Sequence, residues 1–315
     1  MSRLKKSLIL ISVLFFAISN LKADTSPFRF LIYNASARAA AMGGAFEAIL
    51  NDPASIFYNP ATIYTVQDKK FSATFLKHVL DINSGNISYI KNIENAGIFA
   101  ASVVYTNSGV FNTSDNVGYQ DGSTFGSNSM SMALTYANEL DTNLFYGVTV
   151  KYIFENMQKY NSSAFAFDAG LIYKLKDGRT NLGLSILNAG GMIKSFAGVT
   201  ENVPLDIRIG INHRLRGLPL MVCASFHHLA DQTNSIFDKF ANFSFGGELY
   251  VGKAVMLRLG YDNLIRRETT PSTDRQLAGI SAGIGIKTKY VNFDYGMALF
   301  GSGFKLHRFS LALDL

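Results

Sequence analysis

About fourteen short segments of this chain alternate apolar and polar residues, and the connections between them alternate in length. Counted from the first segment, the odd-numbered connections tend to be long and the even-numbered ones tight. Such alternation of long and tight connections is hard to obtain in a soluble β-sandwich. It is typical of bacterial outer-membrane barrels, in which short periplasmic turns alternate with longer outer loops. The sequence therefore predicts an all-β fold, a transmembrane antiparallel β-barrel of about 14 strands.

The alternation is clear in residues 144–154, where Val148 and Val150 fall on one face and Thr149 and Lys151 on the other. Successive side chains of a strand point to opposite sides, so one side is apolar and the other polar. A soluble sandwich would show the same period, but charged polar faces and aromatic segment ends favour a membrane. We expect the barrel over 69–315, with strands at 70–80, 85–92, 95–106, 127–138, 142–155, 163–174, 180–188, 205–214, 219–228, 240–251, 254–262, 277–287, 289–299 and 304–315.

Residues 1–23 have the form of a secretory signal peptide. Three basic residues precede an apolar run from Leu8 to Ile18, and Ala23 offers a cleavage point. The run is too short to span a membrane as a helix. Removing residues 1–23 takes away four basic residues and no acidic one, which lowers the net charge from +6 to +2. We therefore expect an outer-membrane protein in contact with lipid, and so small a charge gives no reason to expect a nucleic-acid partner.

Residues 24–68 do not show the strand pattern. The run 36–42 is rich in alanine, has Ser36 placed as an N-terminal cap, and ends at two glycines. Two turn signals follow it. A barrel of about fourteen strands is wide enough that side chains alone do not fill it. We expect the segment to form a small helical hatch, or plug, in the lumen; a flexible periplasmic tail is the alternative.

This segment contains four short motifs, namely Ser36-Ala37-Arg38, Met42-Gly43-Gly44-Ala45, Asn51-Asp52-Pro53-Ala54-Ser55 and Asn59-Pro60-Ala61. Together they resemble the N-terminal signature of the PorV/PorQ family, whose barrels are similar to the long-chain fatty-acid transporter FadL. The modest length and the region 128–190 look more like PorQ than PorV. The resemblance implies a fourteen-stranded barrel with an N-terminal hatch that works in the type IX secretion system.

The resemblance also implies partners. PorV is associated with the large translocon barrel and with the C-terminal signal domains of secreted cargo, and PorQ belongs to the same machinery. Members of the family act as protein-secretion accessories. An even number of strands places both ends of the barrel on one side, and we expect the hatch and the C-terminus on the periplasmic side.

The sequence gives little indication of catalysis. Adjacent His227 and His228 on a strand would point to opposite faces and could not share one metal ion. The run from Gly283 to Thr288 has the wrong spacing for a phosphate loop, and its glycines are better explained as room for a plug. The single cysteine, Cys223, reads as a small residue in a strand. We expect no enzymatic activity, no cofactor and no metal.

Five charged residues are predicted to face the lumen. They could hold the hatch or contact a transported or docked partner. Alternatively, they could pair across strands and only stabilise the inner wall. These residues are Lys151, Asp168, Arg208, Arg258 and Asp294.

The long outer loops, 107–126 and 263–276 especially, are where partners would be met. The first contains Phe111, Tyr119 and Phe125, and aromatic side chains often anchor interfaces. They could equally fold over the barrel mouth.

Two functions of different classes remain open. The first is a secretion accessory, a plugged barrel whose loops and rim bind the translocon or cargo. The second is a channel for hydrophobic small molecules such as long-chain fatty acids. A channel predicts a continuous apolar tunnel beside the hatch, whereas an accessory predicts a closed wall.

Overall fold

The computed structural model describes residues 28–66, 69–78, 82–114, 120–195, 202–233, 235–269, 276–301 and 304–315. The expected signal peptide and Tyr119 lie outside these ranges. Within them, no helix is long and apolar enough to cross a membrane.

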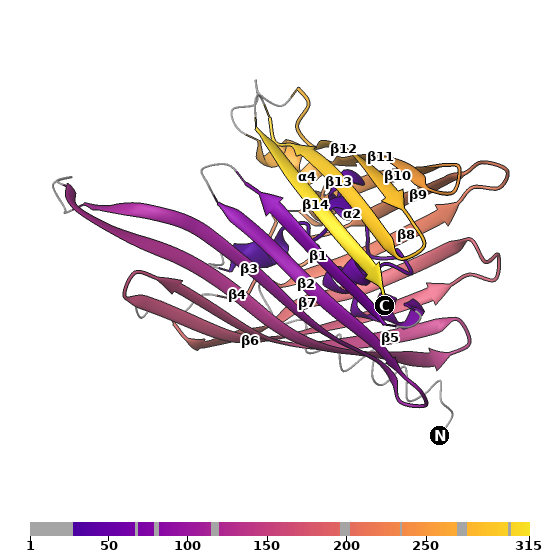
Figure 1. The fold of residues 1–315 in the computed structure, drawn as a ribbon, viewed down its shortest axis with the longest axis horizontal. Helices are drawn as coiled ribbons and strands as arrows, with labels where there is room; N and C mark the ends of the chain where they lie inside the picture. Colours follow the sequence, from indigo (N-terminus) through magenta and orange to yellow (C-terminus); the bar gives the residue numbers. More distant parts are fainter. Residues whose placement is uncertain are drawn as a thin grey trace.

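The described strands form one closed antiparallel barrel in which each strand pairs with its neighbours in sequence and β14 returns to β1 (Figure 1). Lys70 lies opposite Asp314 where the barrel closes. The predicted fold is confirmed. The strands are β1 (Lys70–Lys77), β2 (Asn83–Ile93), β3 (Gly97–Ser114), β4 (Gln120–Asp141), β5 (Leu144–Met157), β6 (Tyr160–Lys174), β7 (Thr180–Lys194), β8 (Asp206–Arg214), β9 (Leu220–Phe226), β10 (Phe243–Val251), β11 (Val255–Asp262), β12 (Ile280–Lys287), β13 (Val291–Leu299) and β14 (Lys305–Asp314).

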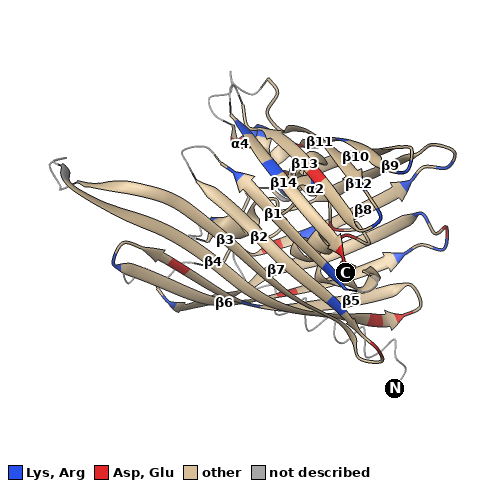
Figure 2. Cartoon of the chain, viewed as in Figure 1, with Lys and Arg blue, Asp and Glu red and all other residues tan. Residues whose placement is uncertain are grey.

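The barrel is apolar outside and polar inside, the reverse of a soluble domain. Val148 and Val150 on β5 are exposed, whereas Thr149 between them is buried. The inner face is held by hydroxyl pairs that cross strands, such as Thr135 with Thr149 at 2.8 Å and Ser72 with Ser88 at 2.7 Å. Exposed rows of large apolar side chains are stable only against lipid. Figure 2 shows that charged residues lie mostly near strand ends and in connections.

The two rims of the barrel differ. One rim, here called the short-turn rim, carries the tight turns 94–96, 142–143, 175–179, 215–219, 252–254 and 288–290, and the chain ends beside it. The opposite rim, the long-connection rim, carries the longer segments and two short helices, although the turn 158–159 between β5 and β6 is also tight. These helices are α3 (Ile236–Phe240) and α4 (Asn263–Glu268).

The prediction of a loop over 107–126 is wrong. β3 continues to Ser114 and β4 starts at Gln120, so most of that stretch is a β-hairpin that projects to the left in Figure 1. β7 likewise runs six residues past its expected end at 188. Polar and glycine-rich composition indicated a loop, but strand pairing between β3 and β4 satisfies the backbone despite weak alternation.

The hatch segment contains η1 (Arg29–Ile32), α2 (Ala37–Ala41), η2 (Pro53–Phe57) and η3 (Pro60–Thr65). The expected helix is confirmed, with Ser36 Oγ accepting from the Ala39 backbone nitrogen. Gly43 and Gly44 end it with φ of 65° and 82°, which favour glycine. Residues 47–48 form a further turn. α2 packs on β11 to β14 and η3 on β4 to β6, so the segment crosses the lumen.

Candidate functional site: the hatch and its anchors in the lumen

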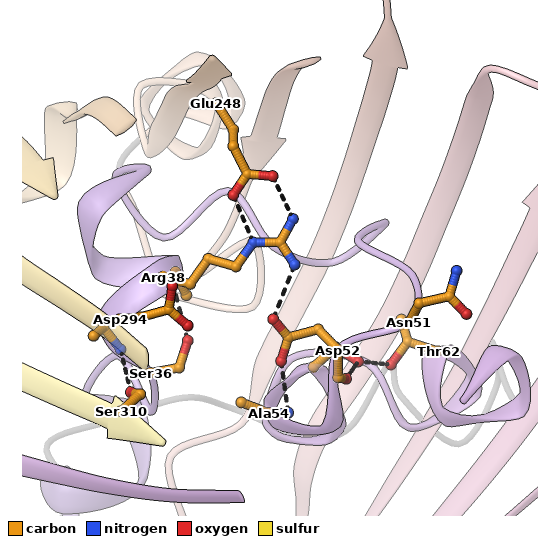
Figure 3. A network of polar contacts seen from close by, with 12 residues as sticks. Ser36, Arg38, Asn51, Asp52, Ala54, Thr62, Glu248, Asp294 and Ser310 are labelled. Atoms are coloured by element: carbon orange, nitrogen blue, oxygen red, sulfur yellow. Dashed lines mark hydrogen bonds and ion pairs between the residues drawn. The ribbon is translucent and has the colours of Figure 1, made fainter. Parts of the chain in front are cut away.

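Arg38 is the main polar anchor of the hatch (Figure 3). Its Nε and Nη2 donate to the two carboxylate oxygens of Glu248 on β10, at 2.8 and 2.7 Å. Its Nη1 donates to Asp52 Oδ2 at 3.0 Å, and Asp52 also caps η2 through Ala54 N. Burial alone would lower the pKa of Arg38, but the carboxylates of Glu248 and Asp52 outweigh it and raise the pKa well above its usual value.

Arg258 extends this network into the barrel wall. Its Nε donates to Glu248 at 2.6 Å and its Nη1 to Asp294 at 2.6 Å. Asp52, Arg38, Glu248, Arg258 and Asp294 therefore form one chain of ion pairs, which joins two parts of the hatch to β10, β11 and β13. Two arginines share three carboxylates, so each guanidinium is neutralised.

A second anchor joins β8 to the hatch. Arg208 donates from Nε to Asp206 at 2.6 Å and from Nη1 to Glu47 at 3.4 Å. Glu47 belongs to the hatch and is 1% exposed. The Arg208 guanidinium also lies 5.6 Å from the ring centre of Tyr58.

The remaining two predicted lumen charges pair within the wall. Lys151 Nζ lies 2.7 Å from Asp168 Oδ2 on the neighbouring strand and donates to Asn188 Oδ1 at 2.7 Å. Both readings of the five charged residues therefore apply, each to different members. Arg208 contacts the hatch directly, and Arg258 and Asp294 do so through Glu248, whereas Lys151 and Asp168 form a cross-strand pair.

Sequence reasoning missed the hatch partners Glu47 and Glu248. Glu248 lies directly opposite Arg258 in the β10–β11 register, so the alternation that placed Arg258 in the lumen would also have placed Glu248 there. Glu47 carried no such signal, because it lies in an irregular segment.

Asn59 fixes the second half of the hatch. Its Nδ2 donates to the backbone oxygens of Glu47 and Leu171, each at 3.0 Å, while its Oδ1 accepts from Ala61 N. Pro60 starts η3. This asparagine therefore links hatch, wall and the cap of η3.

Wall glycines let the hatch backbone approach closely. A Cβ at Gly260 would collide with Gly43 N, and one at Gly147 would lie 2.6 Å from Ala61 N. Gly283 similarly leaves space for the Ala41 side chain. Met42 is fully buried and touches the wall at Gly246.

The hatch separates two sizeable cavities. One of about 620 Å³ opens toward the long-connection rim and is lined by residues such as His227, Leu264 and Phe300. The other, of about 340 Å³, opens toward the short-turn rim and is lined by Arg214, Lys253 and others.

The two expected loop anchors that the structure describes lie on strands. Phe111 on β3 and Phe125 on β4 are direct partners, with ring centres 5.5 Å apart. Val110 beside them is 73% exposed. They form an aromatic pair on the β3–β4 hairpin.

His227 and His228 do not lie on a strand, so the expectation that they face opposite sides is wrong. β9 ends at Phe226, and His228 has a φ of 56°. Their Nδ1 atoms are 2.8 Å apart, and His227 Nε2 lies 3.6 Å from Asp262 Oδ1. Within the described ranges no group of three or more metal-binding side chains is gathered in a geometry that could hold a metal ion.

Comparison with known proteins identifies relatives of this architecture. Residues 17–215 match the family described as "Type IX secretion system protein PorV". No curated protein matches the chain. The toluene transporter TodX of Pseudomonas putida matches with a TM-score of 0.58 and 12% identity, covering 88% of this chain and 96% of its own.

A FadL homologue from Pseudomonas aeruginosa matches with a TM-score of 0.56 and 11% identity, covering 93% of this chain and all of its own. At such identities these likenesses show that the fold is shared.

Proposed function

The chain belongs to the family of the type IX secretion system protein PorV, and from that premise we propose that it is a protein-secretion accessory of the bacterial outer membrane. In this role it binds the large translocon barrel or the C-terminal domains of secreted cargo. The observation that carries the proposal is a hatch held in the lumen by ion pairs to the wall, together with a β3–β4 hairpin that extends past its neighbouring strands.

The way in which the hatch is held favours a scaffold role over an open pore. Its anchors are buried ion pairs to β10 and β8, and removing one partner of such a pair is costly. Its backbone also rests directly on wall glycines. A plug held in this way is suited to a barrel that presents surfaces to partners.

The β3–β4 hairpin offers a surface that could bind the partner. Among the described pairings, β2 accompanies β3 only as far as Asn107, and β5 accompanies β4 only from Ser127. The remaining seven residues of β3 extend about 20 Å at the usual strand rise. They carry the Phe111–Phe125 pair away from the wall, where aromatic side chains can anchor a partner.

The proposal also includes the orientation of the barrel in the outer membrane. In outer-membrane barrels the short turns face the periplasm, so the short-turn rim and the C-terminus would lie there. The long-connection rim and the β3–β4 hairpin would face the outside, where secreted proteins emerge.

Affinity purification of the tagged protein from its native outer membrane, in mild detergent, tests this role. We expect a very large barrel subunit, or surface proteins that share a C-terminal domain, to co-purify. A protein recovered alone, with lipid or fatty acid bound, would contradict the proposal.

A matched pair of variants tests the hairpin. The double substitution Phe111→Ser and Phe125→Ser should reduce recovery of the partner at least tenfold and leave the barrel folded. The control is Phe237→Ser, since Phe237 is 80% exposed on α3 at the same rim. Equal recovery with the double variant and the control would exclude the hairpin as the binding surface.

A second candidate is a channel for hydrophobic small molecules. It is favoured by a groove of about 430 Å³ on the outer face, lined by Phe75, Ile87 and Phe309 among others. Thr74, Gly85 and Asn86 line both this groove and a 50 Å³ cavity inside the wall. Uptake of a radiolabelled long-chain fatty acid by cells with and without the protein separates the two functions.

A further inference from the structure

Arg308 on β14 is a buried cation that no carboxylate in the described part of the chain neutralises. Its side chain is directed at the hatch, and the residue is only 2% exposed. Its Nε donates to the backbone oxygen of Asn34 at 3.1 Å. Its Nη1 is buried and makes no hydrogen bond, and none of the ion pairs within the described ranges includes Arg308.

The arginines of the hatch anchors are different. Arg38, Arg208 and Arg258 each pair with two carboxylates. Burying a guanidinium without such a partner is unfavourable, because the charge loses its hydration and gains no opposite charge in return. A buried charge of this kind is a feature that folding alone would not favour.

Arg308 lines the 620 Å³ cavity above the hatch. Arg208 lines it too, but Asp206 and Glu47 neutralise that residue. The acidic residues of the lining are Asp231 in the connection after β9, Asp262 at the end of β11 and Glu268 at the end of α4. One of them, Asp262, caps α4 and faces His227. The side of the cavity nearest the hatch therefore carries the uncompensated positive charge.

We propose that Arg308 anchors a binding site for a carboxylate group in this cavity. A planar guanidinium matches the planar carboxylate and forms short, charge-assisted hydrogen bonds with it. The volume is ample for a small acid with accompanying water. The carboxylate can belong to a free small acid or to the C-terminal end of a peptide chain. The site goes beyond the secretion role and does not depend on it.

The neighbourhood of Arg308 is polar enough to accept such a ligand. His78 is near enough that burial and the charge of Arg308 together lower the pKa of its imidazole to about 4. At neutral pH this histidine is uncharged and its Nε2 lies 2.8 Å from Ser84 Oγ.

The test uses the full-length protein in detergent micelles and scanning calorimetry. Sodium acetate should raise the unfolding temperature by several degrees and saturate, compared with sodium chloride at equal ionic strength and with neutral acetamide. An N-acetylated tripeptide with a free C-terminus, compared with its amidated form, separates a peptide end from a free acid as the source.

The variant Arg308→Met should lose the acetate response and unfold at a higher temperature than the wild type in acetate-free buffer. Arg29→Met is the control, because Arg29 is exposed and lines the same cavity. It should keep the response. An equal response in Arg308→Met, or no acetate-specific response in the wild type, would overturn the proposal.

If Arg308→Met does not fold, guanidinium ¹⁵N signals of the wild type, assigned with Arg308→Lys, decide the question. The Arg308 signal should shift saturably with acetate and not with acetamide. A signal that does not move would refute the site.

Discussion

The buried arginines on the two sides of the hatch are not all neutralised alike. Toward the short-turn rim, Arg38 and Arg258 share Glu248, Asp52 and Asp294, so every guanidinium has carboxylate partners. Toward the long-connection rim, Arg208 is also neutralised, by Asp206 and Glu47, but Arg308 has only a backbone oxygen among the described residues. The first arrangement fixes the plug, whereas the second leaves a charge that a ligand can use. The same residue type thus serves as an anchor or as a binding group according to what surrounds it.

The largest effect is expected at Glu248, which is 1% exposed and accepts from both Arg38 and Arg258. Glu248→Gln leaves two buried guanidinium groups short of a counter-charge. The free energy of unfolding should fall by about 3–5 kcal/mol, and the hatch should become sensitive to protease. Denaturant unfolding in micelles and limited proteolysis measure both.

Glu139→Gln is the control for that substitution, because Glu139 is exposed and accepts a hydrogen bond from Tyr64 Oη, at 3.2 Å. It should change the unfolding free energy by less than about 0.5 kcal/mol. If the two variants behave alike, the ion-pair chain does not hold the hatch.

A smaller effect is expected from crowding the contact between hatch and wall. Gly260→Ala introduces a Cβ that collides with Gly43 N and Met42, and the loss of stability should be about 1–3 kcal/mol. Gly247→Ala is the matched control on the neighbouring strand, where the nearest atom is 3.9 Å away. Equal unfolding midpoints for the two would show that the hatch shifts freely.

Replacing the unpaired arginine should have the opposite sign. Arg308→Met removes a buried charge that pairs with no carboxylate of the described residues, so the free energy of unfolding in anion-poor buffer should rise by about 1 kcal/mol. Arg38→Met, which takes the shared cationic partner away from Glu248 and Asp52, should lower the free energy of unfolding. Denaturant titrations of both variants compare them, and a loss of stability in both would remove the distinction between the two sides.

The smallest effect is a pair of pH dependences with opposite signs. Burial and Arg308 lower the pKa of His78 to about 4. Burial also acts to lower the pKa of His227, but Asp262 outweighs it and raises the net value. The contribution of His78 to stability should fall as the pH drops from about 6.5 toward 4. That of His227 is present below about pH 6.5 and should be lost as the pH rises through its folded pKa.

NMR titration of ¹³C-labelled histidines measures both pKa values directly. Arg308→Met should move the pKa of His78 upward, toward the usual value, and leave that of His227 unchanged. If the pKa of His78 is the same in the variant and the wild type, the charge of Arg308 is screened from the His78 imidazole.

Much of this architecture is readable from the sequence because its signals are local. The period of two in residues such as Val148 to Lys151 sets which side chains face lipid and which face the lumen. Ser36, Asp52 and Asn59 each cap the turn or helix that follows within three residues. Strand number, barrel class and the helical hatch follow from such short-range patterns.

The tertiary structure alone decided which charged side chains pair and how far the strands extend. Arg38 and Glu248 are 210 residues apart, and no local pattern pairs them. The extension of β3 and β4 past 107 arises from pairing between two strands with weak alternation, so composition indicated a loop there. Whether a buried arginine is neutralised depends on which carboxylates the closed barrel brings within about 3 Å of it. That is why Arg38 and Arg308 look alike in the sequence and differ in the fold.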